Sequence, residues 1–179
     1  DFGLPKNAPL KKINIEFVSA NPTGPLHIGH CRGAIYGDVL SNLLKYCGHN
    51  VTKEYYVNDY GNQITLFLKS IYFRAIEIIK KKKFPEDQGL YPGEYIIDIA
   101  EEILKKININ NYQNFDDAKE VLESIAISIA MNTIKSDLKY MGVNHDIFIL
   151  ESNIVKEGLL LKAISKLKDE GAISKGILP

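Results

Sequence analysis

The sequence predicts an α/β domain built on a parallel sheet. Two strand-like segments, 12–19 and 51–57, flank a helical segment at 28–47, and a strand, helix, strand order of this kind places the strands parallel with a right-handed connection. The composition supports one globular domain, because 45% of the 179 residues are hydrophobic and 22 basic side chains balance 22 acidic ones. Residues 12–57 are therefore expected to form a βαβ unit.

The first strand is predicted from alternation, since Ile13, Ile15 and Phe17 lie on one side. Two prolines and a glycine make 20–26 a loop. A helix is predicted over 28–47, with Gly48 as its end, because apolar residues repeat along this segment at helical spacing. These are Ile28, Ala34, Ile35, Val39, Leu40, Leu43, Leu44 and Cys47.

The second strand, 51–57, is rich in valine, tyrosine and threonine, which favour strands. Helical periodicity then predicts three further helices, and glycine and proline predict a loop between the first two of them. The expected ranges are helices at 60–80, 94–106 and 116–141, a loop at 84–93, a strand at 147–150, a helix at 154–169 and a strand at 172–178.

Several classes of protein are disfavoured by charge and hydropathy. Zero net charge argues against a sequence-blind nucleic-acid binder and a polybasic membrane anchor, although a local RNA contact stays open. Apolar stretches fall far short of the ~20 residues of a membrane span, and the polar opening 1–12 is unlike a signal peptide. Cys31 and Cys47 are expected to be free thiols, which favours a cytoplasmic location. Asp1 and Pro179 suggest that the chain is part of a longer protein.

The residues that carry chemistry lie between the first strand and the first helix. Ligands of open parallel sheets bind beyond the carboxyl ends of the strands, and His27 and His30 fall there. Each imidazole could donate an N–H to a phosphate oxygen, while Gly29 would leave the backbone open to a nucleotide. The pattern H-x-G-H is expected by chance only roughly 0.006 times in this composition. A phosphate site is therefore favoured.

Two alternatives remain open at this stage. His27 and His30 could bind zinc with Cys31, although no second ligand pair lies at ligand spacing. They could also be structural histidines that are satisfied by backbone groups.

The same stretch resembles a known family, the class I aminoacyl-tRNA synthetases, whose first signature is the HIGH tetrad found here at 27–30. The surrounding residues are similar to the arginyl-tRNA synthetases in particular. The matches are Glu16, Ser19, Asn21, Pro25, His27, Gly29 and His30, followed by the blocks 54–59, 61–63, 91–96, 137–138 and 142–143.

The resemblance implies ATP-dependent activation of L-arginine and its attachment to tRNA(Arg), as part of a longer enzyme. It implies a Rossmann-type (HUP-like) half sheet with a helical insertion, an incomplete catalytic domain. Within the amino-terminal half that spans 1–179, residues 12–80 would form the nucleotide-binding βαβ unit and the following helix, and residues 81–179 a mostly helical part with an inserted segment. ATP and accompanying Mg²⁺ would bind, whereas no protein-bound metal and no membrane contact are expected.

Roles follow by position in the resembling motif. His27 and His30 would be catalytic and steady the ATP phosphates, with Gly29 and Pro25 also beside ATP. Arginine would be bound by a second group of residues, in which the Glu16 carboxylate faces the guanidinium, although an exposed strand-end charge is the alternative for Glu16. The other members of this group are Ser19, Asn21 and Gln63.

At Asn58, Asp59 and Gln63, helix capping competes with substrate contact. The second class I signature loop is missing, and we interpret Ser174-Lys175-Gly176 as a chance resemblance to it. His145 stands where the family usually has an aromatic residue. We therefore expect the isolated chain to be inactive. A nucleotide-binding half domain without turnover and a small H-x-G-H nucleotidyltransferase remain the alternative functions.

Overall fold

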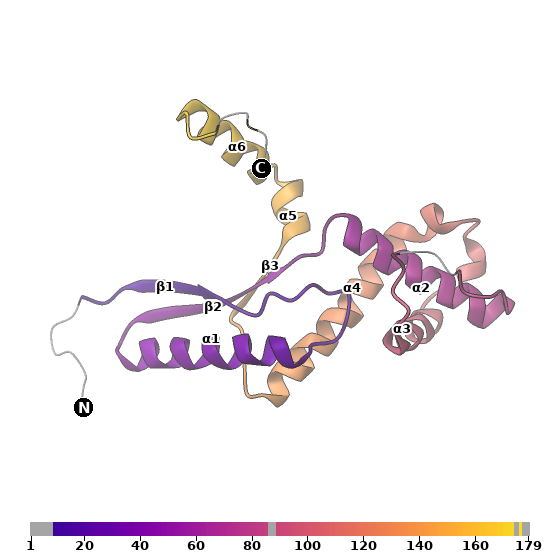
Figure 1. Ribbon diagram of the computed structural model, residues 1–179, viewed down its shortest axis with the longest axis horizontal. Helices are drawn as coiled ribbons and strands as arrows, with labels where there is room; N and C mark the ends of the chain where they lie inside the picture. Colours follow the sequence, from indigo (N-terminus) through magenta and orange to yellow (C-terminus); the bar gives the residue numbers. More distant parts are fainter. Residues whose placement is uncertain (1–8, 86–88, 174–175, 177–179) are drawn as a thin grey trace.

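Within the part of the chain that the structure describes, the sheet has three parallel strands, which include the predicted parallel pair and the predicted short strand at 147–150. The computed structural model describes residues 9–85, 89–173 and 176. Strands β1 (Lys12–Glu16), β2 (Asn50–Val57) and β3 (Ile147–Leu150) lie in the order β1-β2-β3 (Figure 1). Ile13 is opposite Val51, and Tyr55 is opposite Phe148. The α/β class with a parallel half sheet is thus confirmed.

Helix α1 (Ile28–Tyr46) makes the connection between β1 and β2 within one residue of the predicted bounds. The chain leaves the helix through Gly48, whose φ of 89° is readily adopted only by glycine. Asn50 then begins β2. The βαβ unit is therefore present as predicted.

Of the apolar residues that repeat along α1, Ala34 is buried, but most of the others do not face the core. The buried residues of this helix are Ala34, Gly37 and Ser41, whereas the exposed fractions of Ile35 and Val39 are 55% and 58%. The helix turns its small and polar side to the sheet for two reasons. A Cβ at position 37 would overlap the ring of Phe17, and the buried ammonium of Lys53 requires polar partners.

Those polar partners come from α1 itself. The Nζ of Lys53 on β2 donates to Oδ1 of Asp38 at 2.6 Å and to Oδ1 of Asn42 at 2.9 Å. Apolar periodicity alone could not reveal this arrangement, because it identifies apolar residues without saying what covers them.

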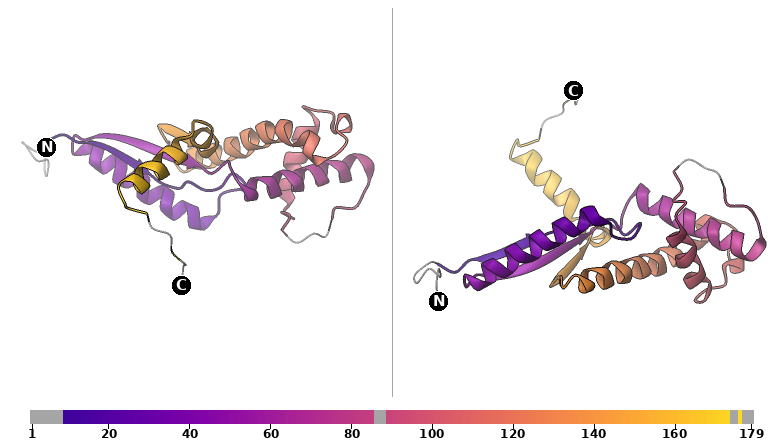
Figure 2. Two further views of the ribbon diagram at one scale, coloured as in Figure 1. Left: turned by 90° about the horizontal axis from the view of Figure 1, so that it is seen from above. Right: turned by 60° about the horizontal axis from the view of Figure 1, so that its bottom comes forward.

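A helical insertion between β2 and β3 contains most of the core. It comprises α2 (Asn62–Lys80), α3 (Glu94–Leu104), the short 3₁₀ helix η1 (Ile109–Asn111) and α4 (Phe115–Tyr140), and α4 leads back to the sheet (Figures 1 and 2). The three predicted helices are thus confirmed. The largest fully buried side chains of the insertion are Phe67, Leu68, Ile71, Ile96, Ile103, Ile109, Leu122, Ile134 and Leu138.

The predicted helix at 154–169 is wrong in one respect. It is two helices, α5 (Glu151–Lys156) and α6 (Leu159–Asp169), because Gly158 adopts a left-handed conformation between them. Helix α6 has no buried residue and projects away from the sheet (Figure 1). Most of the predicted strand 172–178, with Ser174 and Lys175, lies outside the described residues.

The cysteines and the hydropathy of the helices agree with the sequence within the described part of the chain. Its cysteines, Cys31 and Cys47, are free thiols, as predicted. In the ranges 9–85 and 89–173, none of the helices is both long and apolar enough to cross a membrane.

Candidate functional site

The loop between β1 and α1 begins with a strained turn. Val18 and Ser19 have φ values of 68° and 43°, which non-glycine residues rarely adopt and which cost a β-branched residue most. This turn directs the Ser19 hydroxyl back toward the strand end. Its Oγ donates to the Glu16 carboxylate and accepts the backbone N–H of Tyr56 at 3.0 Å. Glu16 is thereby oriented and remains exposed at the carboxyl edge of the sheet.

His27 and His30 lie at the amino end of α1, beyond the carboxyl end of β1, as the sequence predicts. His27 is the N-cap residue, and its Nδ1 accepts the backbone N–H of Gly29 at 3.1 Å. Nδ1 of His30 accepts the backbone N–H of His27 at 3.2 Å. The two rings stack with centroids 3.7 Å apart.

This capping arrangement determines which nitrogen of each ring can donate. Because both Nδ1 atoms accept hydrogen bonds, the proton of each neutral imidazole is on Nε2. Burial and the neighbouring His27 both lower the pKa of His30, so its ring is neutral at pH 7. The pair therefore combines a structural cap through Nδ1 with an N–H donor at each Nε2. The structural alternative and the phosphate-binding hypothesis concern different atoms and are compatible.

Glycine at position 29 leaves room for the His27 ring. A Cβ at this position would lie 2.9 Å from Cε1 and 3.0 Å from Nδ1 of His27, closer than side chains approach. A larger residue would displace the His27 ring from its cap. Pro25, the other predicted ATP contact, is exposed and lines a cavity of about 170 Å³ together with Gly24 and Tyr95.

Three amide side chains meet at the carboxyl edge of the sheet. Nδ2 of Asn21 donates to Oε1 of Gln63 at 2.7 Å, and Nδ2 of Asn58 donates to Oδ1 of Asn21 at 3.1 Å. The predicted arginine-binding residues thus form two neighbouring clusters, Glu16 with Ser19 and Asn21 with Gln63. Glu16 ends β1, while Ser19, Asn21 and Gln63 follow β1 or β2, and the carboxyl ends of these parallel strands share one edge.

Asp59 has a structural partner that the sequence analysis missed. It is 5% exposed, and its carboxylate accepts the backbone N–H of Ser152 at 2.9 Å and the Ser152 hydroxyl at 2.7 Å. The N-cap of α2 is Gly61, so Asp59 does not cap the helix that follows it. It instead fixes the start of α5, from which it is 93 positions distant along the chain.

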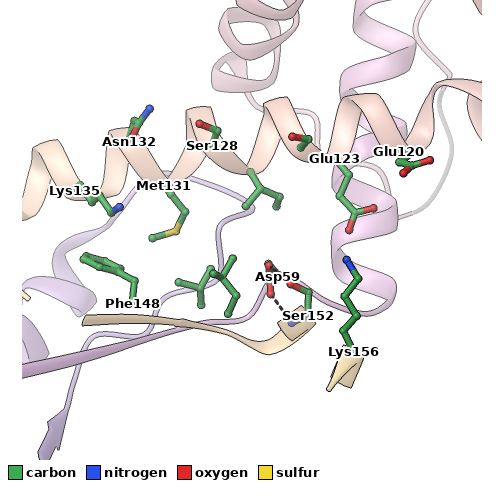
Figure 3. Close-up of a pocket in the computed structure, with 14 residues that line it drawn as sticks. Asp59, Glu120, Glu123, Ser128, Met131, Asn132, Lys135, Phe148, Ser152 and Lys156 are labelled. Carbon is green, nitrogen blue, oxygen red and sulfur yellow. Dashed lines mark hydrogen bonds between the residues drawn. The ribbon is translucent and has the colours of Figure 1, made fainter. Parts of the chain in front are cut away.

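A cavity of about 640 Å³ lies between α4 and the ends of β2 and β3 (Figure 3). Asp59 and Ser152 form part of its wall, and Nζ of Lys135 lies 4.2 Å from the ring centroid of Phe148. None of the predicted site residues on the β1 to α1 loop lines this cavity. The candidate site is thus the edge of the sheet that carries Glu16, Asn21, His27 and His30, and it is separate from this cavity.

The described residues are also informative about metals. Across 9–85 and 89–173, the structure contains no group of three or more histidine, cysteine, aspartate or glutamate side chains that could hold an ion. The first turn of α1 carries no acidic residue.

A parallel half sheet with a histidine pair capping the first crossover helix defines an α/β protein of the Rossmann-like class. A family model described as "tRNA synthetases class I (R), catalytic domain" matches residues 3–176. The chain belongs to this family.

Individual relatives agree with the family assignment. The chain is 47% identical over 177 residues to "Arginine--tRNA ligase" of Pelagibacter ubique, which covers 98% of this chain and 31% of that protein. It is 46% identical over 168 residues to the protein of the same name from Anaplasma phagocytophilum, covering 94% of this chain and 29% of that protein. The chain thus spans about a third of the length of these relatives.

Solved structures show the same fold. A putative arginyl-tRNA synthetase from Campylobacter jejuni aligns with a TM-score of 0.79 at 33% identity, covering 97% of this chain and 37% of that one. The arginyl-tRNA synthetase of Thermus thermophilus aligns with a TM-score of 0.56 at 20% identity, covering 93% and 28%, and shows likeness of fold alone.

Proposed function

We propose that this chain supplies the histidine-bearing half of the catalytic domain of a longer arginine-tRNA ligase. That enzyme would activate L-arginine with ATP and transfer the arginyl group to tRNA(Arg). The observation that carries this proposal is the His27 and His30 pair, whose Nδ1 atoms cap α1 and whose Nε2 atoms are left to donate, in a chain of this family.

ATP would bind with its phosphates at the amino end of α1. The helix terminus favours negative charge, and the two Nε2–H groups would stabilise the charge that develops as the carboxylate of arginine attacks the α-phosphorus and pyrophosphate departs. Gly29 keeps His27 in its capping position and, with Pro25, would lie beside the nucleotide. Mg²⁺ would accompany ATP and neutralise the departing pyrophosphate.

Arginine would lie at the neighbouring strand ends. The Glu16 carboxylate is a suitable bidentate partner for a guanidinium, and the Ser19 hydroxyl already holds this carboxylate in one orientation. The amide groups of Asn21 and Gln63, linked at 2.7 Å, would contact the polar backbone groups of the amino acid. We assign residues 12–80 to this nucleotide-binding unit and residues 81–179 to the mostly helical remainder.

The proposal is tested on a polypeptide of the relatives' length that contains this chain. Arginine-dependent exchange of pyrophosphate into ATP and charging of tRNA(Arg) are measured, with lysine replacing arginine as the control for a cationic amino acid. Exchange with arginine but not with lysine is expected. Nucleotide binding without exchange would instead favour the half domain that lacks turnover, and adenylyl transfer without amino acid would favour the nucleotidyltransferase.

A further inference from the structure

Three side chains form hydrogen bonds with backbone carbonyl oxygens of the loop that carries the candidate site, and the three carbonyls are three residues apart in the sequence. Nε2 of His145 lies 3.2 Å from the Phe17 oxygen. The phenol of Tyr55 donates to the Ala20 oxygen at 2.8 Å, and the phenol of Tyr95 donates to the Thr23 oxygen at 3.0 Å. These three donors come from three different parts of the fold, so the loop is fixed from several sides.

Tyr95 differs from the other two because it belongs to the helical insertion. It lies in the first turn of α3, whereas Tyr55 is on β2 and His145 follows α4. Its phenol reaches from the insertion to Thr23 in the loop, and Thr23 lies four residues before His27 in the sequence. A Cβ at Gly24 would lie 3.4 Å from its hydroxyl oxygen, which shows how closely the loop backbone approaches this ring.

The residues before Tyr95 make room for this contact. A Cβ at Gly93 would overlap the Tyr95 ring, so glycine at the N-cap of α3 allows the ring to fold back over the helix start. Burial, and to a smaller extent Tyr91, raise the pKa of Tyr95 above the ordinary value of a phenol, and the hydroxyl donates to the Thr23 oxygen. The contact thus gives a physical reason for Gly93 and Tyr95 within the block 91–96.

We propose that Tyr95 is a positioning residue that couples the helical insertion to the histidine-bearing loop through the Thr23 carbonyl. The inference rests on the proposed function for its catalytic consequence, but the anchor itself is a structural claim. With Tyr55 holding Ala20 and Tyr95 holding Thr23, the loop backbone is fixed shortly before the point where His27 caps α1. Loss of the Tyr95 anchor should leave the histidines present but imperfectly aimed at the phosphates.

The test uses Tyr95→Phe, which removes only the hydroxyl, in the longer polypeptide that contains this chain. Tyr72→Phe is the matched control, because Tyr72 is a buried tyrosine of α2 in the same insertion and packs on Phe73 and Phe115 rather than on the loop. Hydrogen exchange of the amides of residues 18–30, the thermal midpoint, and kcat and KM for arginine-dependent pyrophosphate exchange are measured for both variants.

We expect Tyr95→Phe to accelerate amide exchange in the loop and to lower kcat about 2- to 10-fold, the effect of one lost neutral hydrogen bond, with KM for arginine unchanged. Tyr72→Phe should change neither loop exchange nor kcat. Unchanged loop exchange in Tyr95→Phe would overturn the anchor. Faster loop exchange with unaltered kcat, or equal effects in both variants, would overturn the positioning role.

The two proposals fail in distinguishable ways. A wild-type polypeptide without arginine-dependent exchange would contradict the proposed function. The amide-exchange comparison of Tyr95→Phe with Tyr72→Phe would still decide whether the anchor exists, because it requires no turnover.

Discussion

Each histidine of the site uses its two nitrogens differently. In His27 and His30, Nδ1 accepts a backbone N–H, and Nε2 is the nitrogen that can donate. A histidine pair that caps its own helix has fixed tautomers and fixed ring orientation before any ligand arrives. This preorganisation is what electrostatic stabilisation of a transition state requires.

Replacing either histidine by alanine should therefore impair chemistry more than binding. In the longer polypeptide, His27→Ala or His30→Ala should slow arginine-dependent pyrophosphate exchange by about 10²- to 10³-fold, the usual loss when one transition-state donor is removed. The rate at saturating arginine is the measurement. An increase in KM for arginine with an unaltered rate would place these residues in the amino-acid pocket instead.

Glu16 offers a second test at the residue scale. Glu16→Gln keeps the shape of the side chain and removes its charge, so arginine affinity should fall by about 10- to 150-fold, which corresponds to about 1.5 to 3 kcal/mol for a charge-assisted hydrogen bond. ATP affinity should change little. Titration calorimetry with each ligand separates the two, and equal losses would favour a strand-end structural role.

At the scale of elements, the packing of α1 on the sheet is decided by small residues. Gly37 faces the ring of Phe17, whereas the Cβ of a side chain at Gly33 would meet nothing within 4 Å. These two glycines lie one turn apart in the same helix and differ only in what surrounds them.

This pair yields a matched stability test. Gly37→Ala should destabilise the protein by about 1 to 3 kcal/mol, because the added methyl overpacks the contact with Phe17. Gly33→Ala should stabilise it by about 0.5 to 1 kcal/mol through helix propensity. Urea unfolding of both variants measures the difference. Equal and favourable effects would mean that α1 can move away from the sheet at little cost.

Across the described residues, several apolar side chains on α1 are exposed to solvent. Besides Ile35 and Val39, the residues Tyr36, Leu43 and Tyr46 are exposed by 72%, 57% and 62%. Phe17, by contrast, is buried at 8% exposure, and Ile13 and Ile15 are half-buried. An apolar surface that promotes association is therefore on α1, and not on the strand residues that alternation alone would indicate.

The 179-residue chain by itself should neither arginylate tRNA nor catalyse exchange above background. It supplies donors on the His27 and His30 side alone within its described residues, and its α1 surface should drive self-association at micromolar concentration. Arginylation assays and sedimentation of the purified chain provide the test. Turnover by a well-behaved monomer would mean that some other group, such as Ser174 with Lys175, replaces the missing donors.

The sequence by itself determined the parallel βαβ unit, three of the helices and the loop that carries the histidines. These features depend on local periodicity and on residues close together in the chain, such as the two prolines before His27 and the glycine between the histidines. The resemblance to the class I synthetases also followed from this stretch, because its motif is contiguous, and further short blocks indicated the arginyl family.

Only the tertiary structure decided which face of α1 is buried, that Asp59 holds Ser152, and that Tyr95 reaches Thr23. Local pattern identifies an apolar residue but not the surface that covers it. It also cannot choose among distant partners for a carboxylate or a phenol. Those choices are made by burial, since a polar group removed from water must find a hydrogen-bond partner wherever the fold has placed one.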